Sequence, residues 1–176
     1  MNNLDIKNKI EENQSILFPL KAIDHDSYSL GLIKTLAGKK ICYVSLNRTY
    51  HSLENLFMKF NIDTKNIFYL DGISNSVKET KSENIDKCHF VTFPEATKSL
   101  IEEIGNFLEK GGEYIVFDSV TDLLIFNSRG ESNKLTLDIL DKVKENKSKI
   151  ILIALKGERT KDFIEQVRSV VDDIIE

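Results

Sequence analysis

The chain has 176 residues, of which 41% are hydrophobic and 30% charged, as expected for a soluble globular protein of one domain. Its net charge of −4 comes from 24 basic and 28 acidic residues, and the basic ones are spread along the chain, so we do not expect a nucleic-acid partner. No apolar run reaches the ~18 residues of a membrane span. Residues 1–14 also lack the basic and apolar segments of a secretion signal, so we expect a cytoplasmic protein without a membrane partner.

The first half of the chain alternates between strand-like and helix-like segments. We expect residues 1–14 to form a helical or disordered lead, and residues 15–176 to form a single domain. Residues 15–21 (SILFPLK) predict a strand weakened by Pro19, which should lie near the strand end or on a sheet edge. Helical spacing around Leu30 and Ile33 follows, with Gly38 at the helix end. The remaining elements expected in this half are a strand at 41–46, a helix from 53 to 60, a strand at 67–70 and a long polar loop at 71–87.

The second half repeats this alternation, which predicts the fold class. Its expected elements are a strand at 88–93, a helix after Pro94, a strand from Tyr114, a helix from 135 to 143, a strand at 150–155, a helix from Thr160 and a short strand at 172–175. Alternating strands and helices predict a three-layer α/β fold, with a mainly parallel sheet and helices on both faces. Residues 41–44 and 114–117 are apolar on both strand faces, so we expect them at the centre of the sheet.

The stretch from Tyr114 to Phe126, YIVFDSVTDLLIF, contains the strongest functional signal. Its apolar run ends in Asp118 and Ser119, which places an acid and a hydroxyl at the carboxyl edge of the sheet, where α/β proteins bind ligands. These two residues could bind a metal ion or another ligand, or they could cap the helix that begins near Asp122. We favour the structural role.

Three motifs in the same order resemble the RecA/KaiC-type branch of the P-loop ATPases. They are ICYVSLN on an early strand, YIVFDSVTDLLIF on a later strand, and VVDDIIE at the end of the domain. The resemblance covers about residues 15–176 and implies a RecA/KaiC-like fold. RecA-type domains commonly assemble side by side, so the resemblance also implies a homo-oligomer or a complex with a related protein.

The chain departs from this family at two of the three positions that ATP hydrolysis needs. The phosphate-binding motif G-x-x-x-x-G-K-S/T is absent, and KAIDHDSYSLG stands in its place between the first strand and the first helix. Asn47 stands where KaiC-type ATPases have a catalytic glutamate, and an amide cannot accept the proton of the attacking water. Only the Asp118 position remains. We therefore expect a degenerate member, a pseudo-ATPase that is not an enzyme and has no catalytic residues and no cofactor.

Other polar residues allow more than one interpretation. Asp24, His25 and Asp26 could form a metal site, but adjacent residues rarely converge on one ion. We instead expect Asp24, Asp26 or Ser27 to cap the following helix. Arg48 could bind a phosphate or a partner's carboxylate, or it could be a surface arginine, and the sequence leaves both open.

The cysteines and the remaining histidines carry weaker signals. Cys42 and Cys88 could form a disulfide or a metal pair, but their apolar surroundings favour two small buried hydrophobic residues. His51 and His89 have no Cys or Asp at ligand spacing, so we expect neither to take part in chemistry.

Two functional hypotheses follow. The favoured one is a non-catalytic RecA/KaiC-like domain that acts through a protein partner or a homo-oligomer, with residues 77–87 and 127–131 as the expected contact surfaces. A role in signalling or regulation would fit such a module. The alternative is a small-molecule or nucleotide-binding enzyme that uses Arg48 and Asp118 at the same sheet edge. The candidate ligand-binding residues are Asn47, Arg48, Asp118 and Ser119, and no metal site is expected.

Overall fold

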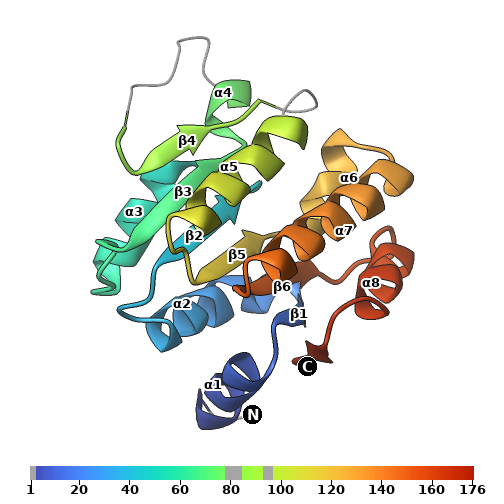
Figure 1. Ribbon diagram of the computed structural model, residues 1–176, viewed down its shortest axis with the longest axis horizontal. Helices are drawn as coiled ribbons and strands as arrows, with labels where there is room; N and C mark the ends of the chain where they lie inside the picture. The colour runs from blue at the N-terminus through green and yellow to red at the C-terminus, as the bar shows by residue number, and fades with distance from the viewer. Residues whose placement is uncertain (1–2, 78–84, 93–96) are drawn as a thin grey trace.

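The computed structural model describes residues 3–77, 85–92 and 97–176, which form a seven-stranded parallel sheet with helices on both faces (Figure 1). The strands are β1 (Ser15–Leu20), β2 (Ile41–Ser45), β3 (Ile67–Asp71), β4 (Cys88–Phe90), β5 (Tyr114–Asp118), β6 (Lys149–Leu155) and β7 (Asp173–Ile174). The helices are α1 (Asn3–Glu12), α2 (His25–Thr35), α3 (Tyr50–Lys59), α4 (Ser74–Val77), α5 (Thr97–Glu109), α6 (Leu123–Phe126), α7 (Arg129–Glu145) and α8 (Lys161–Arg168), and the 3-10 turns are η1 (Ala22–Asp24) and η2 (Val120–Asp122). The predicted three-layer α/β fold is confirmed.

The strand order is β4-β3-β2-β5-β6-β1-β7, so β2 and β5, the two strands predicted to be central, are neighbours at the centre of the sheet, as expected. Pro19 lies near the end of β1, which is the first of its two predicted places. Strand β1 lies next to the edge strand β7, which pairs only with Ile16 and Leu17. Pro19 lies beyond that pairing, where its missing N–H leaves no ladder hydrogen bond unmade.

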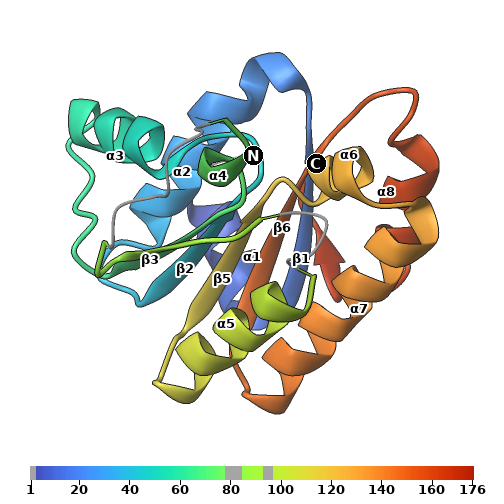
Figure 2. The ribbon, with the colours of Figure 1, turned by 90° about the horizontal axis from the view of Figure 1, so that it is seen from above.

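Two apolar clusters, one on each face of the sheet, form the core. Side chains in a strand alternate between faces. In β2, Cys42 and Val44 belong to the cluster under α5 and α7, whereas Ile41 and Tyr43 belong to the cluster under α2 and α3. Figure 2 shows the sheet between these two pairs of helices. Cys42 and Cys88 are free and buried in opposite clusters, which agrees with the expectation of small core residues.

Helix α1 packs against the domain rather than standing apart from it. Ile6 and Ile10 are buried in the cluster under α2. The Lys149 Nζ on β6 donates hydrogen bonds to three carbonyl oxygens at the end of α1, those of Ile10 at 2.8 Å, Glu11 at 2.6 Å and Asn13 at 2.9 Å. A cation placed there satisfies carbonyls that the helix itself leaves unpaired.

Two segments expected to be loops contain helices. Within the polar stretch 71–87, residues Ser74–Val77 form α4, and residues 78–84 lie outside the described residues, as do Pro94 and its neighbours. The stretch 127–131, predicted to be a loop, runs from the end of α6 into the first turn of α7, which Ser128 caps by accepting a hydrogen bond from the Glu131 N–H at 3.3 Å. The Glu131 carboxylate returns to the Ser128 N–H at 2.9 Å, so an S-x-x-E capping box begins the helix there.

Across the described residues, no helix combines the length and the apolar character that spanning a membrane requires.

Candidate functional site

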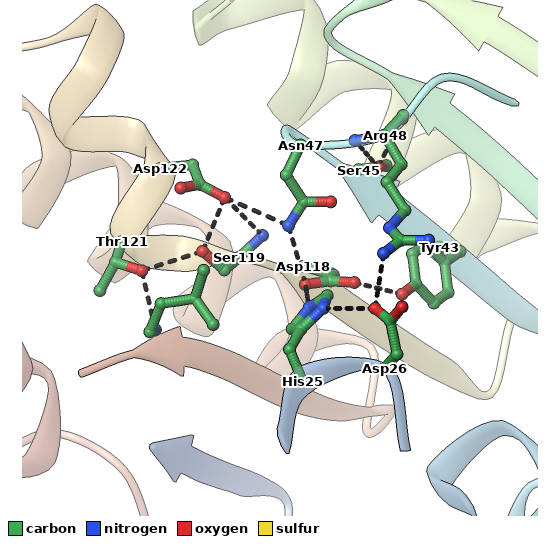
Figure 3. A network of polar contacts seen from close by, with 11 residues as sticks. His25, Asp26, Tyr43, Ser45, Asn47, Arg48, Asp118, Ser119, Thr121 and Asp122 are labelled. Carbon is green, nitrogen blue, oxygen red and sulfur yellow. Dashed lines mark hydrogen bonds and ion pairs between the residues drawn. The ribbon is translucent and has the colours of Figure 1, made fainter. Parts of the chain in front are cut away.

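Polar side chains meet at the carboxyl edge of the central strands (Figure 3). Strands β2 and β5 run in parallel with Ser45 opposite Asp118, so both strands end at the same height. The first turn of α2, the connection from β2 to α3 and the η2 turn after β5 all begin at this edge. Residues that are far apart in sequence therefore form one network.

Asp118 is the centre of this network. It is completely buried, and its carboxylate contacts three side chains from other segments. Its Oδ1 lies 2.5 Å from His25 Nε2 and accepts a hydrogen bond from Asn47 Nδ2 at 3.2 Å, while its Oδ2 accepts one from the Tyr43 hydroxyl. A buried carboxylate needs such partners, because removing a charge from water costs several kcal/mol, of order 5, unless it is paired. The peptide bond between Asp118 and Ser119 is cis.

His25 lies between two carboxylates. Its Nε2 contacts Asp118 and its Nδ1 lies 3.3 Å from Oδ1 of Asp26. Only the protonated imidazole can donate a hydrogen bond from both ring nitrogens. Burial by itself lowers the pKa of His25, but the hydrogen bonds and charges of Asp118 and then Asp26 outweigh burial and raise the pKa above its ordinary value of 6.5.

Arg48 and Asp26 form the outer part of the network. Arg48 Nη2 donates to Asp26 Oδ1 at 2.5 Å, and the Asp26 side chain is about half exposed. Burial raises the pKa of Asp26, but the hydrogen bonds from His25 and Arg48 outweigh it and hold the pKa below its usual value. The Arg48 backbone is fixed as well, because the Ser45 hydroxyl donates to its carbonyl oxygen at 2.7 Å.

Asn47 links Asp118 to a second acid. Its Nδ2 also donates to Asp122 Oδ2 at 3.3 Å, and the same oxygen accepts the Ser119 hydroxyl at 2.7 Å. Burial raises the pKa of Asp122 despite these hydrogen bonds. Thr121 ties the turn to β6, because its Oγ1 accepts the Leu155 N–H at 2.9 Å.

The four residues proposed from sequence belong to this one network by different routes. Asn47 and Asp118 are in direct contact, Ser119 joins through Asp122, and Arg48 joins through Asp26. Ser119 and Asp122 hydrogen-bond locally within the η2 turn, which is the capping type of geometry, whereas Asp118 bonds to side chains that are distant in sequence.

The expected capping of α2 by Asp24, Asp26 or Ser27 is wrong. Asp24 is the N-cap residue, but its side chain makes no capping hydrogen bond, and the Ser27 hydroxyl donates to the Asp24 carbonyl oxygen at 2.9 Å. The reason is that η1 runs directly into α2, so Asp24 has helical dihedrals (φ −93°, ψ −11°) instead of the extended ones of a capping residue. The next two side chains, His25 and Asp26, are then free to reach the site.

Sequence reasoning considered His25 only as a possible metal ligand and Asp26 only as a metal ligand or helix cap, and it missed Tyr43 and Asp122 as members of the site. The sequence gives little indication of Tyr43 as a site residue, because an aromatic residue in an apolar strand is typical of the core. For His25 a signal existed, since a histidine between two acids at the end of a parallel strand lies at the ligand-binding edge. Among the described residues, no group of three or more His, Cys, Asp or Glu side chains is arranged to hold a metal ion.

The connection at which P-loop ATPases bind phosphate is short in this chain. Only Lys21 and the η1 turn separate β1 from α2, and no glycine precedes Gly31. Asp24 and Asp26 stand at this helix start, where carboxylates interact favourably with the helix dipole and compete with an anion for the same place.

Comparisons with known proteins agree with this architecture. A solved KaiC-like protein from the hyperthermophilic archaeon Pyrococcus horikoshii superposes on 86% of this chain and 67% of its own chain, with a TM-score of 0.58 and 15% identity. At that identity the likeness concerns the fold, which is of the RecA/KaiC type. No curated protein matches the sequence. The model of a family of unknown function, DUF7090, matches residues 22–176, from the η1 turn to the end of the chain. The chain therefore belongs to the DUF7090 family.

Proposed function

We propose that this protein is a RecA/KaiC-like domain that does not hydrolyse ATP and acts by associating with protein, in the first place with a second copy of itself. The observation that carries the first half of this proposal is the contact between His25 and Asp118. His25, which stands where the phosphate loop is missing, pairs with Asp118, the one acid that the ATPase resemblance retains.

The charges around this contact also oppose a triphosphate. Asp24, Asp26 and Asp122 lie within a few residues of the same edge, and one cationic partner, Arg48, is already paired with Asp26. At a partly buried site, with an effective dielectric constant near 20, two like charges about 4 Å apart repel by about 4 kcal/mol. A bound nucleotide would have to displace existing pairs before it gained any contact.

The alternative, a nucleotide or small-molecule enzyme using Arg48 and Asp118, needs both side chains to be available. Asp118 has three partners within its own chain, and Arg48 donates to Asp26 at 2.5 Å. No feature of the described residues favours this function over the first.

Two exposed isoleucines support the second half of the proposal. Ile23 in η1 is 89% exposed and Ile125 in α6 is 72% exposed. The η1 turn comes one residue after β1, and α6 follows the η2 turn after β5. Residues 127–131, expected from sequence to contact a partner, continue the chain from α6 into α7. Large exposed apolar side chains in turns after strands whose edge carboxylate, Asp118, is already paired within the chain suit a contact surface better than a catalytic one.

Nucleotide assays test the catalytic part. We expect no ATP hydrolysis above background and no change in Tm with Mg-ATP or Mg-ADP. A ligand at 100 times its Kd would add about 2.7 kcal/mol, which is several degrees of Tm for a domain of this size. Turnover that disappears in Asp118→Asn would overturn the proposal.

Sedimentation velocity over a range of concentrations tests the association. We expect wild type to form a dimer or larger species and the double variant Ile23→Ser, Ile125→Ser to shift toward monomer. Met58→Ser is a matched control, because Met58 is 70% exposed but lies near the end of α3, which runs away from the carboxyl edge. A wild type that stays monomeric at the highest concentration would remove self-association as the function.

A further inference from the structure

We propose that His25 is a proton-dependent clamp, which as an imidazolium holds the first turn of α2 against the ends of β5 and β2 and which loosens when the ring loses its proton. The inference goes beyond the proposed function. Both use the contact of His25 with Asp118, but the clamp concerns the protonation of that contact, whereas the proposed function concerns catalysis and association, so either can fail without the other.

The clamp follows from the two contacts of the His25 ring. Nε2 lies 2.5 Å from Asp118 Oδ1 and Nδ1 lies 3.3 Å from Asp26 Oδ1, so both nitrogens face carboxylate oxygens. A neutral imidazole has one N–H, and its other nitrogen would then present a lone pair to an oxygen. His25 is only 7% exposed, so water has little room to replace the lost hydrogen bond.

The His25–Asp118 contact links, through side chains, two segments that are far apart in the chain. His25 is the first residue of α2, and Asp118 is the last residue of β5. Tyr43 of β2 and Asn47 after it contact the same carboxylate. Loss of the His25 contact would therefore loosen the helix start from β5, while Asp26 remained paired with Arg48 and β5 remained bonded to β2.

The groups that face His25 favour its charged form. Asp26 on α2 and Asp118 on β5 are in direct contact, and they raise the pKa of the ring although burial opposes them. Arg48, in the connection after β2, pairs with Asp26 and so weakens the effect of that acid. The buried hydroxyl of Tyr43 donates a hydrogen bond to Asp118 and so stabilises the charge of that carboxylate. Asp122 is linked to Asp118 through Asn47, whose amide donates to both acids.

The direction of the pH effect follows from the raised pKa. The stabilisation is fully present below the unfolded pKa of about 6.5 and is lost as the pH rises through the folded pKa, which lies above that value. We therefore expect the first turn of α2 to open more readily in neutral to alkaline solution. The expected loss of protection is about tenfold for each unit by which the folded pKa exceeds the unfolded one.

NMR on the full chain tests this directly. We expect the His25 ring to titrate with a midpoint above 6.5, and the amide protection factors at the start of α2 to fall as the pH rises from about 5.5 to about 9. His25→Gln keeps a donor for Asp118 but cannot titrate, so the pH dependence of that protection should disappear.

His89→Gln is the matched control, because His89 also contacts a carboxylate, Glu103 Oε2 at 2.8 Å, but its side chain is 53% exposed. This change should leave the pH dependence at α2 as in wild type. A His25 midpoint at or below 6.5 in the wild type would overturn the clamp, whether or not the glutamine variant folds. A pH response at α2 that persists in His25→Gln would overturn it as well.

Discussion

Two buried acids stand at the same height in the sheet and are held in opposite ways. Ser45 of β2 is paired in register with Asp71 on β3 and with Asp118 on β5. Asp71 is 1% exposed and Asp118 is fully buried. Both end a parallel strand at the carboxyl edge, so their positions alone do not distinguish them.

Asp71 is bonded mainly to nearby backbone. It accepts the N–H groups of Tyr50 at 2.6 Å, Ile73 at 2.8 Å and Ser74 at 2.8 Å, and the Ser74 hydroxyl at 2.6 Å. None of these donors titrates near neutral pH. The carboxylate fixes the starts of α3 and α4 and serves the fold.

Asp118 is instead bonded to side chains 93, 75 and 71 residues away in sequence, those of His25, Tyr43 and Asn47. His25 is the one of these donors that changes its charge near neutral pH, and the three come from α2, β2 and the connection after β2. The comparison shows how one sheet edge can hold a structural acid and a responsive one. What differs is the source of the hydrogen bonds, backbone in one case and side chains in the other.

Asp118→Ala should have the largest effect. It leaves the imidazolium of His25 buried without its closest partner, and breaking one side of a buried pair costs about 3–5 kcal/mol. The cost should be greatest in acid solution and should shrink as the pH rises, because the wild type then loses the same pair. Urea unfolding at several pH values measures this, and a cost below about 1 kcal/mol at pH 6 would show that the contact contributes little.

Asp71→Ala should cost less, about 2 kcal/mol, because its donors are neutral backbone N–H groups and a hydroxyl, so the change leaves no buried cation without a partner. The cost should not depend on pH from about 6 to about 9, since no titratable donor is involved. The same urea series compares the two alanine variants. A pH dependence as steep as that of Asp118→Ala would remove the distinction between the two acids.

The fold could be predicted because it depends on local patterns. Apolar runs predicted the strands, and the missing N–H of Pro19 predicted its place near the end of β1. The carboxyl edge could also be predicted as the place where Asn47 and Asp118 lie, since parallel strands end together. The contact of His25 with Asp118 could not, because it joins residues 93 positions apart and depends on a helical rather than extended Asp24. Local capping preferences gave the wrong expectation there.

Arg48→Gln should have the smallest effect on stability, below about 1 kcal/mol, because it removes an ion pair whose acid, Asp26, is about half exposed. Its effect on His25 should nevertheless be measurable. Arg48 and His25 share Asp26 Oδ1, so without the guanidinium the full charge of Asp26 acts on the imidazole and should raise the His25 midpoint further. An NMR titration of the variant beside the wild type measures the shift. A midpoint that falls would mean that Arg48 positions Asp26 for His25 instead of competing for it, and the outer part of the network would then belong to the clamp itself.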